Sequence, residues 1–126
     1  MLIAVPVFRS RISPVFDVAQ ILFMVDVEDG VEGGRRELSL SGLRPKERSA
    51  LLEREGVDLL ICGAITRFSQ HLVERAGIRI HAGVAGDVEQ VLNAFCQNRL
   101  DQACFRMPGC CRRRGQRGRG GRFIDR

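Results

Sequence analysis

Short apolar runs separated by turn residues predict five strands along this chain. Residues 2–7 form a continuous apolar run, which is typical of a strand buried on both faces. Similar runs follow at residues 20–27, 31–40, 57–62 and 78–81. Asp29-Gly30 separates the second run from the third and predicts an antiparallel hairpin. Gly33 and Gly34 interrupt the third run, which predicts an edge strand with a bulge.

Helical periodicity predicts three helices between and after these strands. The first begins at Pro45 and ends before Gly56, the second spans about residues 67–76 and ends at Gly77, and Asp87 caps the third. The residues expected on their buried faces are Leu43, Ala50 and Leu51, then Phe68, Leu72, Val73 and Ala76, then Val88, Val91, Leu92 and Phe95. From residue 57 the order strand, helix, strand, helix predicts parallel strands. The fold class is therefore α/β, with a mixed sheet and helices on both faces.

The charge divides the chain into two parts. Residues 106–126 contain eight Arg and one acidic residue, Asp125, whereas the preceding part is mildly acidic. We expect one α/β domain over residues 1–100 and a Cys-, Arg- and Gly-rich tail over residues 101–126 that is disordered. Only the tail indicates an anionic partner.

The chain shows no secretory signal, and its longest uncharged apolar stretch is far too short to cross a bilayer. We therefore expect a cytoplasmic protein without membrane contact. In a reducing compartment its five cysteines are expected to be thiols or metal ligands rather than disulfides.

Six segments in order resemble one known family. They are IAVPV, ISPVFDVAQ, FMVDVEDG, EREGVDLLICGAI, ERAGIRIHAG and GDVEQVLNAF, and they span about residues 1–100. Together they resemble the dinitrogenase iron-molybdenum cofactor biosynthesis family, the NifX and NafY type of domain. The resemblance implies a three-layer ribonuclease-H-like fold with five strands in the order 3-2-1-4-5, strand 2 being antiparallel. It also implies a non-catalytic protein that binds or carries a metal-sulfur cluster, either the iron-molybdenum cofactor or a related iron-sulfur or molybdenum-sulfur species. A donor or acceptor protein in cofactor assembly would be its partner.

With that strand order, the reversal point lies between the strands that end at Val7 and Cys62. Ligands in open α/β sheets usually bind beyond the carboxyl ends of the strands at such a point. Two helices begin there, and we expect their free N–H groups to point at the cleft. The predicted cluster-contacting residues are Arg9, Ser10, Ser13, Cys62, Gly63, Thr66, His81, Gly83 and Gly86. The alternatives are that the glycines only form turns, that Cys62 only packs, and that His81 is structural.

The tail cysteines form a second candidate site. Cys104, Cys110 and Cys111 could hold a metal, since thiolates are preferred ligands of soft metals and iron-sulfur clusters. Cys96 precedes them but lies near an apolar helix face. Their spacing matches no zinc or ferredoxin pattern, so redox-active or inert thiols stay open as alternatives.

Two other function classes compete with the cluster carrier. The Arg/Gly-rich tail is typical of segments that bind single-stranded nucleic acid, and it could equally bind an acidic partner protein. A nuclease would need several carboxylates clustered at one end of the sheet, whereas Asp26 is expected within its strand and Asp58 near the start of another. The sequence therefore predicts no enzyme. It leaves the oligomeric state open, although the Gly33-Gly34 edge strand could pair between subunits.

Overall fold

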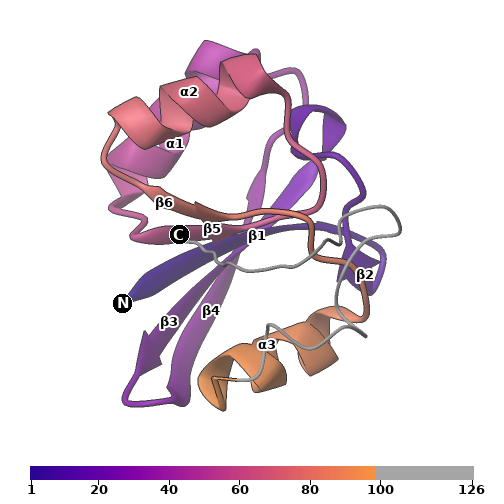
Figure 1. Ribbon diagram of the computed structural model, residues 1–126, viewed down its shortest axis with the longest axis vertical. Coiled ribbons are helices and arrows are strands. Elements are labelled where there is room, and N and C mark those ends of the chain that lie inside the picture. Colours follow the sequence, from indigo (N-terminus) through magenta and orange to yellow (C-terminus); the bar gives the residue numbers. More distant parts are fainter. Residues whose placement is uncertain (99–126) are drawn as a thin grey trace, which may run out of the picture.

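The computed structural model describes residues 1–98, and the predicted tail lies outside them. A single sheet forms the middle layer, with two helices on one face and one on the other (Figure 1). The strands are β1 (Leu2–Phe8), β2 (Arg11–Ile12), β3 (Ile21–Glu28), β4 (Val31–Ser39), β5 (Leu59–Ile61) and β6 (Arg79–His81). The helices are α1 (Pro45–Glu55), α2 (Arg67–Arg75) and α3 (Val88–Cys96), and a short 3-10 helix, η1, spans Phe16–Val18.

The strands lie in the order β4-β3-β1-β5-β6, and β2 pairs with β1 outside this path. The pairs β1–β3 and β3–β4 are antiparallel, whereas β1–β5 and β5–β6 are parallel. β4 therefore runs parallel to β1, and α1, α2 and α3 all begin at the end of the sheet where β1 and β5 end. We call this the loop end of the molecule. The predicted α/β class, mixed sheet and three helices are confirmed.

The central strands are apolar on both faces because each face is covered. Ile3, Val5 and Val7 of β1 pack with residues of α3, whereas Ala4 packs with Leu52 of α1 and other residues on the opposite face. Figure 1 shows α1 and α2 together above the sheet and α3 below it. This two-sided burial explains why residues 2–7 lack the polar alternation of a half-exposed strand.

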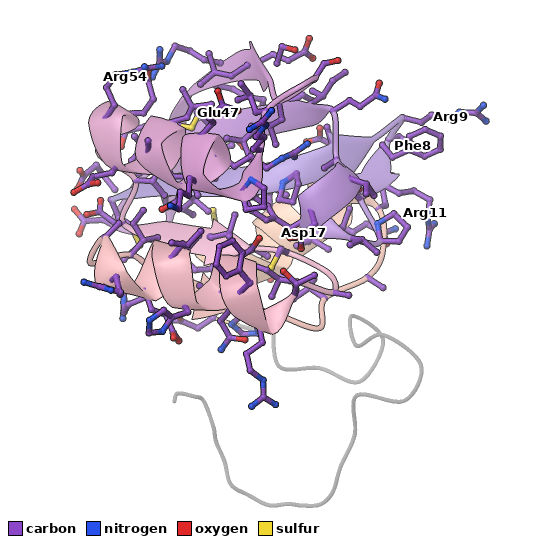
Figure 2. The ribbon with its side chains drawn as sticks, turned by 90° about the horizontal axis from the view of Figure 1, so that it is seen from above. Phe8, Arg9, Arg11, Asp17, Glu47 and Arg54 are labelled. Atoms are coloured by element: carbon purple, nitrogen blue, oxygen red, sulfur yellow. The ribbon has the colours of Figure 1, made fainter. Side chains whose placement is uncertain are left out.

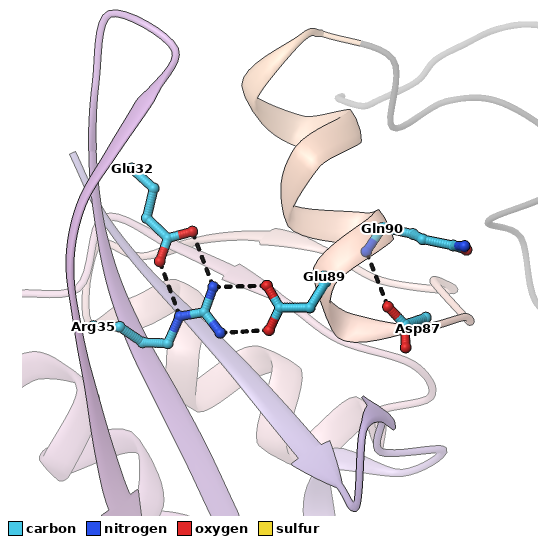
Figure 3. Close-up of polar contacts among 5 residues, drawn as sticks. All are labelled: Glu32, Arg35, Asp87, Glu89 and Gln90. Carbon is cyan, nitrogen blue, oxygen red and sulfur yellow. Dashed lines mark hydrogen bonds and ion pairs between the residues drawn. The ribbon is translucent and has the colours of Figure 1, made fainter.

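The predicted bulge in the edge strand is present. The β3–β4 register shifts between Asp26 and Val27, whose partners are Gly34 and Glu32, so Gly33 is the extra residue. Two arginines then fix this edge to the helices on either side. Arg35 forms paired hydrogen bonds with Glu32 of β4 and with Glu89 of α3, as Figure 3 shows. Arg36 Nη2 lies 2.8 Å from Glu55 Oε1 of α1.

The sequence prediction missed a sixth strand. No strand was predicted between residues 7 and 20, but Ile12 lies opposite Val7 as part of β2 and is only 4% exposed. One buried apolar residue between exposed neighbours was enough to extend the sheet, and a single residue gives no periodic signal.

Two predicted helix faces are partly wrong. On α1, Ala50 is exposed and the buried residues are Arg48, Ser49, Leu51 and Leu52, because Arg48 reaches polar groups under the helix. On α2, Phe68 is 56% exposed rather than buried, whereas Val73 is buried as expected. Asp87 caps α3 as predicted, with its carboxylate accepting from Gln90 N at 3.2 Å (Figure 3).

Candidate functional site

Three segments that follow β1, β5 and β6, at residues 9–16, 62–66 and 82–87, lie against one another. Backbone hydrogen bonds join the first loop to the other two, and the second to the third. The pairs are Ile12 N to Gly86 O, Val88 N to Ser10 O, Ala64 N to Pro14 O, Phe16 N to Ala64 O, and Gly83 N to Gly63 O, all between 2.8 and 2.9 Å. The loop end is therefore one connected surface rather than three independent loops.

The glycines of this surface are required by the backbone. A Cβ atom on Gly63 would lie 2.6 Å from Pro14 O and 2.9 Å from Ser13 O, so only glycine fits beside that loop. Gly83 and Gly86 have φ angles of +79° and +133°, which favour glycine. Their positions thus explain these glycines without a ligand.

The N–H groups at the helix starts are not as free as predicted. Thr66 N donates to Asp17 Oδ1 at 2.9 Å, and Ser69 N donates to Thr66 Oγ1 at 3.2 Å. On α3, Val88 N and Gln90 N donate to Ser10 O and Asp87 Oδ2. The protein itself satisfies these four donors, so they do not point at a ligand as expected.

Asp17 and Arg48, which were not among the predicted site residues, form hydrogen bonds that fix the backbone of the loop end. Asp17 accepts from Thr66 Oγ1 at 2.8 Å and from Ser69 Oγ, and so links η1 to the start of α2. The Arg48 guanidinium is buried and donates to the carbonyl oxygens of Ala19 at 2.6 Å, Leu43 at 3.0 Å and Phe16 at 3.1 Å. These bonds hold η1 between α1 and α2.

The pKa values of this pair follow from burial and hydrogen bonding. Burial alone would raise the pKa of Asp17, but the hydrogen bonds from Ser69 and Thr66 and the charge of Arg48 lower it below its usual value. Burial lowers the pKa of Arg48, and the charge of Asp17 opposes this. Asp17 is therefore a carboxylate at neutral pH. Because it lies 49 residues from Thr66, no local motif could have revealed the link.

Phe8, Arg9 and Arg11 project from the loop end (Figure 2). Phe8 is 60% exposed, and the Arg9 guanidinium carbon lies 5.1 Å from its ring centroid. Arg9 has a φ of +59°, which is uncommon for a residue with a side chain. Ser10 beside it is exposed, whereas Ser13 is buried and donates from Oγ to Val15 O at 3.4 Å. Of the two predicted serines, only Ser10 is accessible.

Cys62 and His81 lie side by side at the ends of β5 and β6, since Cys62 N donates to His81 O at 3.0 Å. The Cys62 side chain is fully buried among apolar residues, and burial raises the pKa of its thiol to about 12. In the absence of a metal it is thus a neutral thiol within the core. His81 is half-buried.

The model of one protein family matches residues 1–98, which is the whole described part of the chain; its description is dinitrogenase iron-molybdenum cofactor. The chain belongs to this family. The resemblance inferred from the six sequence segments is therefore confirmed. No curated protein matches the chain.

Solved structures support the fold of this dinitrogenase iron-molybdenum cofactor family member. PH0822 superposes with a TM-score of 0.74 at 19% identity, covering 80% of this chain and 94% of that one. A "putative dinitrogenase" from Methanocaldococcus jannaschii gives 0.67 at 17% identity, with coverages of 83% and 96%. A "putative NifB protein" from Thermotoga gives 0.62 at 21% identity, with coverages of 90% and 98%. At these identities the likeness establishes the fold alone.

Metal ligation was also predicted for cysteines of the tail. Cys104, Cys110 and Cys111 lie outside the described residues. Within residues 1–98, no group of three or more His, Cys, Asp or Glu side chains is placed to hold a metal ion. In the same part of the chain, no helix is long and apolar enough to cross a membrane.

Proposed function

We propose that this chain binds a metal-sulfur cluster, the iron-molybdenum cofactor or a related iron-sulfur or molybdenum-sulfur species, and carries it during cofactor assembly in the cytoplasm. It does so as a carrier, without catalysing a reaction, and exchanges the cluster with a donor or acceptor protein. The observation that supports this best is the family match over the whole described domain. The strand order also supports our assignment of the fold as ribonuclease-H-like.

We place the cluster at the loop end of the sheet. Arg9 and Ser10 are exposed there, with Thr66, Gly83 and Gly86 on the adjoining loops and His81 at the end of β6. Metal-sulfur clusters are anionic, and exposed guanidinium groups attract anions without replacing a metal ligand. His81 supplies the one imidazole of this surface, and imidazole is a common ligand of transition metals. Ser13, Cys62 and Gly63 support the surface from within, since all three are buried.

Cys104, Cys110 and Cys111 of the tail form a possible second holding point in this proposal, because thiolates are preferred ligands of iron-sulfur clusters. The two sites would bind the cluster through different interactions. Loop-end binding depends on charge and one imidazole, whereas tail binding depends on sulfur ligation. Substitutions can therefore separate them.

The test is reconstitution of the full chain, purified without oxygen, with iron, molybdate and sulfide. Bound iron, molybdenum and sulfide are then measured together with the visible absorption spectrum. Two pairs of variants locate the cluster: His81→Ala against His71→Ala, and Arg9→Glu against Arg54→Glu. His71 and Arg54 are exposed residues of α2 and α1, and Figure 2 shows Arg54 on the opposite side of the molecule from Arg9. A third variant replaces Cys104, Cys110 and Cys111 with serine.

We expect stoichiometric metal and colour in the wild type, and at least a fivefold loss of bound metal in His81→Ala and Arg9→Glu but not in their controls. Loss of metal only in the triple cysteine variant would move the cluster to the tail. A colourless, metal-free wild type after reconstitution would refute the carrier function altogether.

A further inference from the structure

Large apolar side chains are exposed at the loop end. Phe8 is 60% exposed, Val18 70% and Phe68 56%, and these are three of the six large apolar residues that are exposed within residues 1–98. They come from β1, η1 and α2, which are distant in sequence. Single exposed apolar residues are ordinary on a surface, but three from separate elements at one end need an explanation.

Strand pairing and the hydrogen bonds of Asp17 place the three residues on the same face of the sheet, at its loop end. Phe8 lies directly opposite Arg11 in the β1–β2 pair, so both side chains are on the same face of the sheet. This is the face covered by α1 and α2, because Ala4, which shares its side of β1 with Phe8, packs there. On the same face, Asp17 binds Thr66 and Ser69, which puts Val18 of η1 beside the first turn of α2.

Three arginines lie at the same end of the molecule as these apolar side chains. Arg9, Arg11 and Arg67 are exposed, and within the described part of the chain none of them forms an ion pair. Two carboxylates lie nearby and both already accept hydrogen bonds within the protein: Asp17 from Thr66 and Ser69, and Asp87, the cross-strand partner of Arg11, from Gln90 N. The domain as a whole is mildly acidic, with eleven Lys and Arg against thirteen Asp and Glu in residues 1–98. Unneutralised positive charge therefore coincides with exposed apolar area, and we call Phe8, Arg9, Arg11, Val18, Arg67 and Phe68 the docking patch.

We propose that the docking patch binds a protein whose matching surface combines acidic and apolar side chains, and that this protein exchanges the cluster with the loop end. The second half of this proposal rests on the proposed function. Aromatic residues and arginine are the types enriched at protein interfaces. Complementary charge would steer the partner onto the end where the cluster is held. A single-stranded nucleic acid fits less well, because Val18 offers no surface on which a base can stack.

The test is a titration of ¹⁵N-labelled full chain with a synthetic peptide that alternates Glu with Leu, followed by backbone amide chemical shifts. Phe8→Ser is compared with Val31→Ser, since Val31 is a similarly exposed apolar residue of β4. Arg11→Glu is compared with Arg75→Glu, an exposed residue at the far end of α2. The arginine-rich residues 106–126 are the same in all variants, so their attraction for the peptide cancels in each comparison.

We expect shifts at residues 8–11, 18, 67 and 68, and about tenfold weaker binding in Phe8→Ser and Arg11→Glu, a factor that corresponds to ~1.4 kcal/mol. The two controls should bind within twofold of the wild type. Equal weakening in a variant and its control would overturn the proposal. So would a polyuridine strand that shifts the same amides and loses binding in Phe8→Ser, or self-association that Phe8→Ser abolishes.

Cluster loading, measured on the same four variants, separates this proposal from the proposed function. If Phe8→Ser and Arg11→Glu bind the peptide more weakly than their controls but no variant binds a cluster, the docking patch is supported and the carrier function is refuted. If all variants bind a cluster and all bind the peptide equally, the carrier function is supported and the docking patch is refuted.

Discussion

Arginines serve the edge strand β4 and the loop end in opposite ways. On β4, Arg35 forms paired hydrogen bonds to Glu32 and Glu89, and Arg36 pairs with Glu55. At the loop end, Arg9 and Arg11 have no carboxylate partner among residues 1–98. The first group neutralises its charge within the fold, whereas the second presents its charge to solvent.

This difference indicates what each region does. Paired charges on both faces of an edge strand, together with a bulge, discourage pairing with another strand. Unpaired charges beside exposed apolar side chains are suited to an external partner. The loop end can present such a surface because another arginine, Arg48, is buried beneath it and holds its backbone. This division between arginines that stabilise the fold and arginines that face solvent can be tested by substitution.

The largest effect is expected from Arg48→Met. The substitution removes the hydrogen bonds to three carbonyl oxygens, two of them buried, and a positive charge near Asp17. We expect a loss of about 4 kcal/mol in the free energy of unfolding, measured by urea denaturation. Arg36→Met is the control, since its side chain is 58% exposed, and it should cost less than about 1 kcal/mol. Similar losses in both variants would contradict the distinction between buried and surface arginines.

Gly63→Ala should cost about 3 kcal/mol, because the added Cβ would lie under 3.0 Å from two backbone oxygens of the neighbouring loop. The control is Gly34→Ala on β4, where a Cβ atom would meet nothing within 4 Å. That change should alter the free energy of unfolding by less than about 1 kcal/mol. Urea denaturation of both variants measures this, and a Gly63→Ala protein as stable as wild type would show that the loops are not tightly packed.

Asp17→Asn should lower the free energy of unfolding by about 2 kcal/mol at neutral pH, because Asp17 accepts hydrogen bonds from Thr66 and Ser69 as a carboxylate. The pKa of Asp17 is lowered in the folded state. Its contribution is therefore complete above the usual Asp pKa and is lost as the pH falls through the lowered folded value. Denaturation at several pH values should show wild type and variant converging below about pH 4. A constant difference down to the lowest pH would argue against an ionised Asp17.

The smallest effect is expected from Arg35→Gln, at about 1 kcal/mol, because its partner Glu89 has a side chain that is 68% exposed. The hydrogen bonds to Arg35 lower the pKa of Glu89. A double-mutant cycle with Glu89→Gln at low and high salt measures the coupling, which should weaken as salt is added. A coupling energy that does not change with salt would mean that side-chain packing rather than charge joins β4 to α3.

The sequence predicted the features of this fold that depend on local pattern. The apolar run at residues 2–7, the Asp29-Gly30 turn and the Asp87 cap each have a signal within a few residues, and the structure contains all three. The bulge at Gly33 was also predicted, because glycine pairs inside strands have few other uses.

The support of the candidate site could not be predicted in the same way. Asp17 and Thr66 meet only after β1, β5 and α2 have assembled, and Arg48 lies in a helix whose sequence is mostly charged. Phe68 was placed on a buried face because of its helical spacing from Leu72, whereas it is exposed beside Arg67. The predicted contact residues themselves stay predictions until cluster binding is measured.

The central position of β1 bears on how the chain is made. Its antiparallel neighbour β3 follows within 20 residues, but its parallel neighbour β5 begins only at Leu59. At a ribosomal rate of ~5–20 residues per second, the second edge of β1 stays open for about 3 to 10 s after the strand has been synthesised. During that interval an apolar strand edge faces other nascent chains. Chaperones should therefore bind the nascent chain more often before about residue 60, and with it β5, has emerged than afterwards.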